Sequence, residues 1–424
     1  MSPTGGRPAS PLRRDLLFSN ADSVAYSVMV GCGETYLPAF ALALGLGPLA
    51  AGLIASLPVL IGAVVQLITP FGVGWLGSNR RWVIGCTTLQ AISFLPLVVW
   101  AMRGEAALWQ LLTAASVYWS AGMAGFPAWS SWMGLLIPAQ VRAVYFAKRN
   151  RSAQFGVLFG FVAGGFVLQA ATAAEAAFQA FAGLFLAAAA SRIVSTLCLV
   201  CCREPVGHGE PTPVEAEPAA ARRAWRHLPQ TIAALVRSPA GALLAAVWVF
   251  TFATRISAAY FTPFLLEELR FSYQAYMGVL ATGLFAKAVA LPTFGRLGSR
   301  IGSVRLLRLG GILVVPLSAL WLVSRSWWYL IGLQLIAGTC WAIVDLASAL
   351  LLYDAVRHRE RTGVVTLHNL GIALATLAGA AVGGAVLRWY GELQAGYLAV
   401  FLLSGIARLA VLPLLWRVRF SDAD

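Results

Sequence analysis

Charged residues are scarce in this chain of 424 residues. They make up 11% of the sequence, whereas hydrophobic residues make up 59%, and the mean hydropathy is +0.76. Residues 35–79 and 106–141 contain no charged side chain at all. Each run exceeds the roughly 20 residues with which an α-helix crosses a bilayer. Soluble proteins of this length do not need so much apolar surface, so the composition predicts a polytopic, all-α membrane protein.

Histidine and cysteine are also few, with four and six copies in the chain. The cysteines lie within or at the ends of apolar runs, and none has zinc-ligand spacing with a histidine. The sequence has no phosphate-binding GxxxxGK[S/T] loop and no Gly-x-Ser-x-Gly motif. We therefore expect no metal, no cofactor and no catalytic residues.

Positive charge exceeds negative charge by 14, and it has a clear pattern along the chain. The cations do not form a face with interleaved aromatic residues, which argues against nucleic acid as a partner. They gather instead in alternate segments between apolar runs, as the positive-inside rule predicts for cytoplasmic loops. The first 23 residues carry three arginines without an apolar signal region, so we expect a cytoplasmic tail. These patterns predict a monomer in the inner membrane, surrounded by lipid, with both termini in the cytoplasm.

The apolar runs predict twelve spans in two halves. The spans are approximately 20–44, 48–73, 82–102, 106–137, 152–172, 176–202, 239–265, 272–294, 304–323, 327–353, 363–387 and 394–416. One long polar segment, 203–238, separates the sixth span from the seventh and contains a proline- and glutamate-rich stretch. We therefore predict an N-terminal half over 1–202, a cytoplasmic linker over 203–238 that tethers the halves, and a C-terminal half over 239–424.

The two halves repeat one another. Leu-Gly-Ser occurs at 76–78 and 297–299, Gly164-Gly165 matches Gly383-Gly384, and Arg192 matches Arg408. A colinear series of matches at a nearly constant offset indicates a duplication of six spans.

A short Gly- and Arg-rich segment follows the second span of the second half. Its motif residues are Gly295, Arg296, Gly298, Ser299, Arg300, Gly302 and Arg305. Together with twelve spans and a central loop, this Gly-x-Leu-x-x-Arg-x-Gly-x-x-Arg pattern resembles the major facilitator superfamily. The resemblance implies two pseudo-symmetric six-helix bundles, transport by alternating access, and a cytoplasmic turn at 294–305 that takes part in gating. Ser299 stands where the family usually has Asp, and the related segment 72–81 has no acidic residue either.

Ionisable residues inside spans are costly, which makes them candidates for function. Glu34 and Arg255 lie at similar depths in the first and seventh spans, and the resemblance implies that these spans flank the central cavity. They are predicted to form an ion pair that a solute or a proton breaks, or a permanent pair that locks the halves. Lys287 and Asp345 form a second candidate pair, whose alternative is a structural salt bridge within the second half.

Other candidates for the cavity are less charged. Tyr26 lies two helical turns before Glu34 on one face, Trp129 lies in an aromatic stretch of the fourth span, and His368 and Asn369 lie in the eleventh. Packing is the alternative role for these aromatic residues. Arg192 and Arg408 are predicted to be structural anchors outside the cavity, with Asp22 as a partner for one of them.

The sequence thus predicts a secondary transporter of a small organic or amphiphilic solute, with protons as a candidate coupling ion. Without an ATP-binding loop, the energy must come from a gradient or from the solute itself. One alternative is a lipid-acting membrane protein, against which this sequence has no His/Asp cluster. The other is a non-transporting sensor on the same fold.

Overall fold

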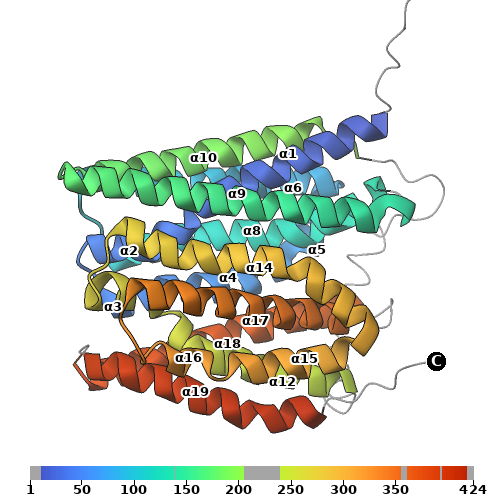
Figure 1. The fold of residues 1–424 in the computed structure, drawn as a ribbon. Coiled ribbons are helices and arrows are strands. Elements are labelled where there is room, and N and C mark those ends of the chain that lie inside the picture. Colours follow the sequence, from blue (N-terminus) through green and yellow to red (C-terminus); the bar gives the residue numbers. More distant parts are fainter. Residues whose placement is uncertain (1–10, 138, 205–238, 355–360, 392–393, 418–424) are drawn as a thin grey trace, which may run out of the picture.

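The computed structural model describes residues 11–137, 139–204, 239–354, 361–391 and 394–417. Over these residues the chain is helical, without a β-strand, and the helices run roughly side by side in one bundle (Figure 1). The first half contains α1 (Pro11–Cys32), η1 (Glu34–Tyr36), α2 (Leu37–Ala43), α3 (Gly47–Ile54), α4 (Leu57–Val65), η2 (Gln66–Ile68), α5 (Thr69–Leu76), α6 (Asn79–Ile92), α7 (Phe94–Arg103), α8 (Leu108–Leu136), α9 (Ala139–Ala173) and α10 (Ala177–Cys201). The second contains α12 (Pro239–Ala258), α13 (Phe261–Pro263), η3 (Phe264–Glu268), α14 (Tyr273–Ile301), α15 (Ser303–Val314), α16 (Leu317–Leu320), α17 (Trp327–Asp354), α18 (Arg361–Trp389) and α19 (Gln394–Arg417).

These helices make the twelve predicted spans, several of which are broken by proline or glycine. The second span is assembled from α3, α4, η2 and α5, and each of its α-helices carries a proline in its first turn. Proline lacks the N–H that would continue the preceding helix, so each break lies where a proline starts the next piece. Within the described residues, nine segments are long and apolar enough to cross a membrane by themselves. The other three spans contain the polar α1, the Trp- and Ser-rich α8 and the short α15.

The predicted turn over 294–305 is mostly helix. Helix α14 continues through the Gly- and Arg-rich segment to Ile301, and the chain turns only at Gly302, whose φ is +84°. Glycine is the residue that adopts this left-handed conformation without steric cost. The prediction placed the break too early because arginine and isolated glycines are tolerated at the end of a helix.

Equivalent helices pack alike in the two halves. Helix α1 packs on α9 and α10, and α12 packs in the same way on α18 and α19. In each half a buried tyrosine donates a 2.6 Å hydrogen bond to a carbonyl of the neighbouring helix, Tyr36 to Phe161 and Tyr260 to Ala380. The pseudo-symmetry predicted from the sequence is therefore present in the packing.

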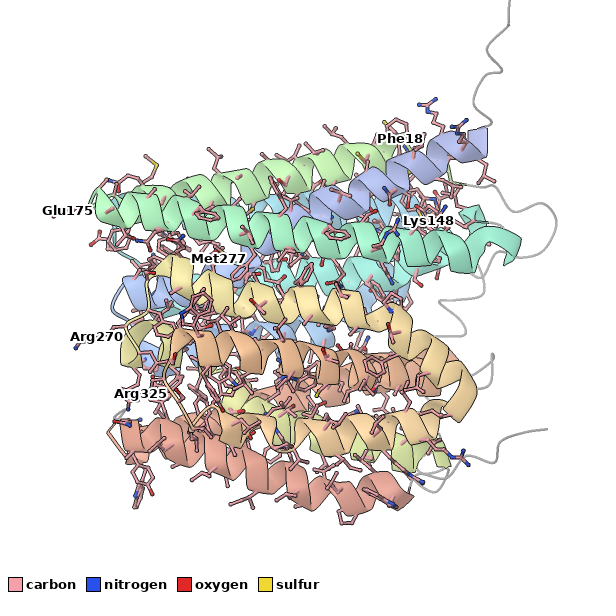
Figure 2. The ribbon with its side chains drawn as sticks, in the orientation of Figure 1. Phe18, Lys148, Glu175, Arg270, Met277 and Arg325 are labelled. Carbon is pink, nitrogen blue, oxygen red and sulfur yellow. The ribbon has the colours of Figure 1, made fainter. Side chains whose placement is uncertain are left out.

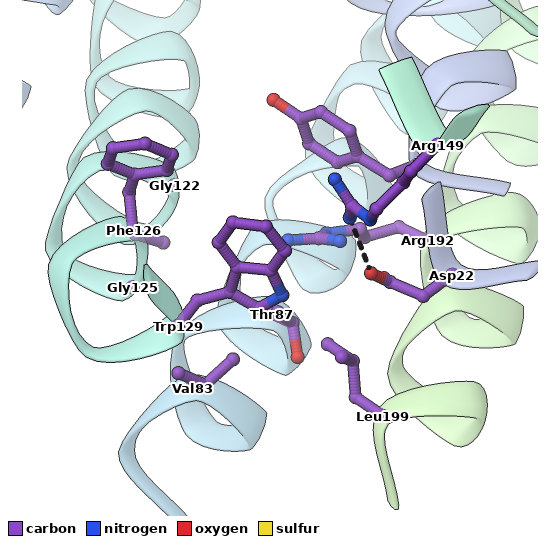
Figure 3. Close-up of a pocket in the computed structure, with 12 residues that line it drawn as sticks. Asp22, Val83, Thr87, Gly122, Gly125, Phe126, Trp129, Arg149, Arg192 and Leu199 are labelled. Atoms are coloured by element: carbon purple, nitrogen blue, oxygen red, sulfur yellow. Dashed lines mark hydrogen bonds and ion pairs between the residues drawn. The ribbon is translucent and has the colours of Figure 1, made fainter. Parts of the chain in front are cut away.

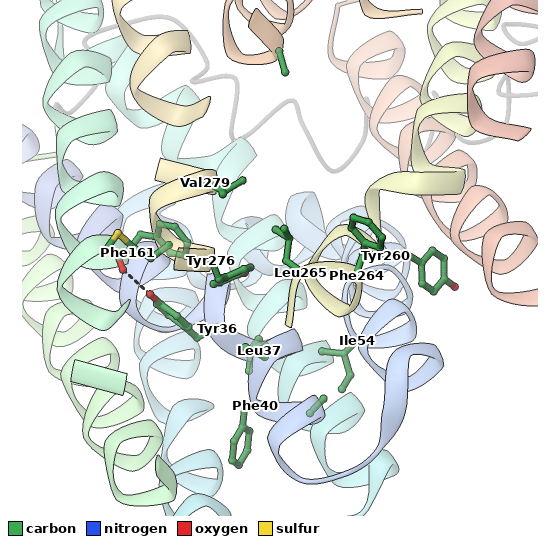
Figure 4. Close-up of a cluster of buried hydrophobic side chains, with 14 of the residues drawn as sticks. Tyr36, Leu37, Phe40, Ile54, Phe161, Tyr260, Phe264, Leu265, Tyr276 and Val279 are labelled. Carbon is green, nitrogen blue, oxygen red and sulfur yellow. Dashed lines mark hydrogen bonds between the residues drawn. The ribbon is translucent and has the colours of Figure 1, made fainter. Parts of the chain in front are cut away.

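The halves meet where α9 packs on α14, α2 on α13, and α18 on α3 and α4. The start of α1 and the end of α19 lie at one end of the bundle, here called the terminal end, while Glu175, Arg270 and Arg325 mark the opposite, far end (Figures 1 and 2). Near the far end α9 packs on α14 and α2 packs on α13. Tyr276 meets Phe161 with 5.9 Å between ring centroids in the buried apolar cluster of Figure 4, and Tyr273 meets Phe181 at 6.0 Å. This aromatic contact joins the two halves.

Candidate functional site

A cavity of about 250 Å³ lies between the halves. Its lining comes mostly from the first half, with three residues of α18 closing it from the second half. The lining residues are Tyr26, Glu34, Val59, Gln66, Gln90, Tyr118, Trp119, Gly122, Met123, Phe126, Asn369, Ile372 and Ala373. Hydroxyl, amide and carboxyl groups are thus set among apolar and aromatic walls, which is the composition of a binding site for a small organic molecule.

Glu34 is held in the wall of this cavity by Tyr118. Helix α1 ends at Cys32, and the 3-10 turn that follows places Glu34 beside α8. The hydroxyl of Tyr118, which is 3% exposed, donates a 2.6 Å hydrogen bond to Glu34 Oε2. The Tyr118 ring packs edge-on against Phe94, so the donor is fixed in place. The cavity wall therefore carries a carboxylate with a fixed hydrogen-bond donor.

The predicted ion pair between Glu34 and Arg255 is wrong for this structure. Glu34 is bonded within its own half, and Arg255 of α12 lies more than 4 Å from every carboxylate among the described residues. The Arg255 side chain is exposed, and its Cβ faces Gly379 of α18. Equal depth in two spans did not bring these groups together because the turn after α1 directs Glu34 towards α8.

Lys287 and Asp345 do form an ion pair, between Nζ and Oδ2. The pair joins α14 to α17, and the side chains of Lys287 and Asp345 are 30% and 46% exposed.

The two candidates in α18 differ in environment. Asn369 lines the central cavity. His368 points elsewhere: its backbone carbonyl accepts a hydrogen bond from Trp248 Nε1 at 3.3 Å, and its buried Nδ1 has no hydrogen-bond partner among the described residues. Adjacent positions on a helix face different directions, so only one of the two reaches the cavity.

A second pocket of about 200 Å³ lies inside the first half (Figure 3). Trp129 lines it together with two arginines, Arg149 of α9 and Arg192 of α10, and with Asp22 of α1. The pocket shares Tyr26, Gly122 and Phe126 with the central cavity, so the two spaces adjoin.

Hydrogen bonds join the charged groups of this second pocket. Arg149 forms a 3.0 Å ion pair with Asp22, whose other oxygen accepts a 2.7 Å hydrogen bond from Ser195. Arg192 donates to Ser195 Oγ at 2.6 Å and to Gln90 Oε1 at 2.8 Å. Asp22 is therefore linked to Arg192 only through Ser195, and its ion pair is with Arg149.

Arg192 does not line the cavity between the halves, as expected, but it does line this second pocket, which the sequence did not predict. Arg149 was missed as a site residue because it lies among the cations between the fourth and fifth spans. Its helix extends past the membrane-spanning part, and the Cζ atom of its guanidinium lies over the Trp129 ring, 4.4 Å from the ring centroid. Its nearness to a tryptophan of the preceding span was the only signal in the sequence.

In part of the Gly- and Arg-rich segment of the second half, the structure describes the backbone alone. The side chains of Arg296, Ser299 and Arg300, and the surroundings of Gly295 and Gly298, lie outside the described residues. Gly302 makes the turn into α15, and the Arg305 side chain is exposed. Its role in gating stays a prediction.

The related segment of the first half obtains an acidic residue from elsewhere in the chain. Glu204 accepts hydrogen bonds from Ser78 Oγ at 2.5 Å and from the Arg80 N–H at 3.2 Å. A carboxylate at the N-terminus of α6 is favoured by the free N–H groups there. No local pattern reveals this contact, because Glu204 lies 126 residues after Ser78.

This architecture defines a transporter-type membrane protein, and the chain belongs to the major facilitator superfamily. The family model, described as Major Facilitator Superfamily, matches residues 23–285 and 243–423. This is a family of transporters and not of enzymes. No curated protein sequence matches the chain.

Solved transporters share the fold at low sequence identity. The chain is similar to the xylose transporter XylE from E. coli, captured in a partially occluded inward-open conformation, with a TM-score of 0.72 and 9% identity over 98% of this chain and 99% of that one. A bacterial homologue of the human lysosomal transporter Spinster, inward-facing and unoccupied, has a TM-score of 0.70 and 15% identity over 99% of this chain and 100% of that one. The nucleoside transporter NupG has a TM-score of 0.67 and 13% identity over 96% of this chain and 100% of that one.

Proposed function

We propose that this protein is a secondary active transporter that moves a small organic solute through the cavity between its halves by alternating access. The observation that carries the proposal is that cavity, in which Glu34 and Tyr118 of the first half face Asn369 of the second. A solute held by groups from both halves binds differently as the halves rock, and this difference is what couples binding to movement.

The proposed state is open towards the terminal end of the bundle. Supporting this are the aromatic contacts between the halves near the far end, Phe161 with Tyr276 and Phe181 with Tyr273. The cations gather in the segments of the terminal end, so we assign this end to the cytoplasm and the protein to a bacterial inner membrane, with both termini cytoplasmic. The solute would then enter or leave on the cytoplasmic side in this conformation.

The polar groups have distinct proposed roles. Glu34, Tyr26 and Asn369 contact the solute, and Glu34 is the proposed proton acceptor because it is the carboxylate that lines the cavity between the halves. Arg255 and the pair formed by Lys287 and Asp345 provide the charges of the second half that change partners when the halves move. His368 supports α18 beside Asn369.

Reconstitution into liposomes tests the proposal. A panel of labelled solutes covering organic anions, cations, sugars, nucleosides and amphiphiles is offered with and without an imposed proton gradient. We expect one class to accumulate above empty liposomes, and Glu34→Gln to remove any stimulation by the gradient. Uptake no faster than in empty liposomes for every class, with protein shown to be folded and inserted, would reject the transporter. Uptake with an unchanged gradient dependence in Glu34→Gln would reject the role of Glu34 alone.

A further inference from the structure

The second pocket suggests what kind of solute the protein handles, an inference that rests on the proposed function. We propose that the pocket lined by Arg149, Arg192 and Trp129 binds the single negative charge of an organic anion, whose apolar body extends into the central cavity. Aromatic and medium-length aliphatic carboxylates fit this description.

The charge balance of the pocket favours an anion. Two arginines and one aspartate line it, which leaves one positive charge in excess. All three are largely buried: the side chains of Arg149 and Asp22 are 13% and 4% exposed, and Arg192 is 6% exposed. Glu34 lies in the adjoining cavity and is bonded to Tyr118, not to either arginine. A buried charge without a counter-charge is unfavourable, so a monoanion would complete the site.

The arginines also have donors to spare. Arg149 donates from Nε to the Ser19 carbonyl and from Nη2 to Asp22. Those of Arg192 use Nε and Nη1. Nη1 of Arg149 and Nη2 of Arg192 therefore donate to none of the described residues. Guanidinium N–H groups match the geometry of a carboxylate, which makes these nitrogens its natural contacts.

Aromatic rings prepare both guanidinium groups for this contact. Arg149 lies over the Trp129 ring, and Arg192 lies 4.8 Å from the centroid of the Tyr26 ring. Stacking fixes the planes of the guanidinium groups before a ligand arrives, so less conformational freedom is lost on binding. In Figure 3 the indole of Trp129 lies beside both arginines, between them and Phe126.

The junction with the central cavity sets the shape of the ligand. Gly122 and Gly125 leave the α8 wall without side chains, and Phe126 and Tyr26 belong to both spaces. An anion at the arginines therefore places its apolar part against Phe126 and Trp119. An inorganic anion would occupy only the charged part of this volume, which is why we infer an amphiphilic one.

The second half shows that the fold does not require an arginine to face a pocket. Arg408, the counterpart of Arg192, donates to the Val314 carbonyl at 3.0 Å and to Ser257 Oγ at 3.1 Å. Arg408 is 3% exposed and lines none of the described pockets. It is thus a matched control with similar burial, an equivalent position in the fold, and no predicted role in binding.

Calorimetric binding to the full-length protein in lipid nanodiscs tests the proposal. The probes are benzoate, its neutral amide benzamide and the cation benzylammonium. We expect benzoate to bind at least tenfold more tightly than the other two. Arg192→Gln and Arg149→Gln should each weaken benzoate binding at least tenfold and leave benzamide binding unchanged, whereas Arg408→Gln should change neither by more than twofold. Arg192→Lys, which keeps the positive charge but not the planar set of guanidinium N–H donors, should recover part of the affinity.

Three outcomes would overturn the anion site. These are equal binding of benzoate and benzamide to the unmodified protein, a preference for benzylammonium, or unchanged benzoate binding in both glutamine variants. The first two need no variant, so a variant that fails to fold leaves the test intact. Specific benzoate binding without uptake into liposomes would reject the transport function while keeping the site. Uptake of neutral or cationic solutes without benzoate binding would do the reverse.

Discussion

At the scale of single residues, the cavity is organised around one short hydrogen bond. Tyr118 donates to Glu34 at 2.6 Å, while Gln66, Gln90 and Asn369 complete the polar lining. Hydrogen bonds to a charged group contribute more than those between neutral groups, on the order of 1.5–3 kcal/mol. Removing the donor should therefore change the behaviour of Glu34 much more than it changes the fold.

We expect Tyr118→Phe to lower the rate of solute uptake at least fivefold while shifting the unfolding temperature by only a few degrees. The reason is that the carboxylate loses its fixed donor, while the ring keeps its packing against Phe94. The measurements are uptake into liposomes and thermal unfolding in detergent. Tyr329→Phe is the matched control, since Tyr329 donates a 2.7 Å bond to Leu320 O in a part of the second half that lines no described pocket. Equal effects of the two variants on uptake would contradict the prediction.

At the scale of elements, the packing of α1 on α9 depends on glycine. A Cβ at Gly160 would lie 2.5 Å from the Val28 carbonyl and 3.0 Å from the Cys32 nitrogen, both backbone atoms of α1. Backbone atoms cannot move aside as the end of a side chain can. The equivalent contact of Gly383 with the Ile256 carbonyl joins α18 to α12 in the second half. Close approach of backbones is how membrane helices without large polar surfaces gain packing energy.

Gly160→Ala should accordingly destabilise the protein by about 1–3 kcal/mol, the usual cost of overpacking. Thermal or denaturant unfolding in detergent measures it. Gly183→Ala is the control, because a Cβ there meets no atom within 4 Å and alanine favours the helix. The prediction fails if Gly160→Ala is as stable as Gly183→Ala.

At the scale of the whole molecule, two sets of contacts hold different ends. The halves join through aromatic rings near the far end. At the terminal end, contacts within the first half fix the start of the linker: Arg203 pairs with Asp15 at 2.7 Å, and Trp132 Nε1 donates to the Arg203 carbonyl at 2.9 Å. The halves are thus joined near the far end, while Arg203, at the start of the predicted linker, is held by the first half.

The proposed orientation gives a labelling pattern that can be measured. In a background with the six native cysteines replaced, Asn369→Cys should react with a membrane-impermeant maleimide faster from the cytoplasmic face, in inverted vesicles. Gln274→Cys, at the exposed far end, should react from the opposite face. Faster labelling of residue 369 from the periplasmic face would contradict the open state, and reversed labelling of both would contradict the orientation.

The sequence by itself determined the fold class, because long uncharged runs and alternating cationic segments leave few ways to satisfy the backbone in a membrane. The duplication was visible in the same way, from pairs such as Arg192 and Arg408. The sequence also predicted the pair of Lys287 and Asp345, two opposite charges at compatible depths in spans of one half.

Only the tertiary structure decided which polar groups meet. Glu34 bonds to Tyr118 and not to Arg255 because a 3-10 turn sets its direction, and a turn of one residue changes the face on which a side chain lies. Glu204 supplies the acid missing from 72–81, and Arg149 joins Arg192 around Asp22, across separations of more than 100 residues. Such contacts depend on helix rotation and on the path of the whole chain, which hydrophobic patterning does not specify.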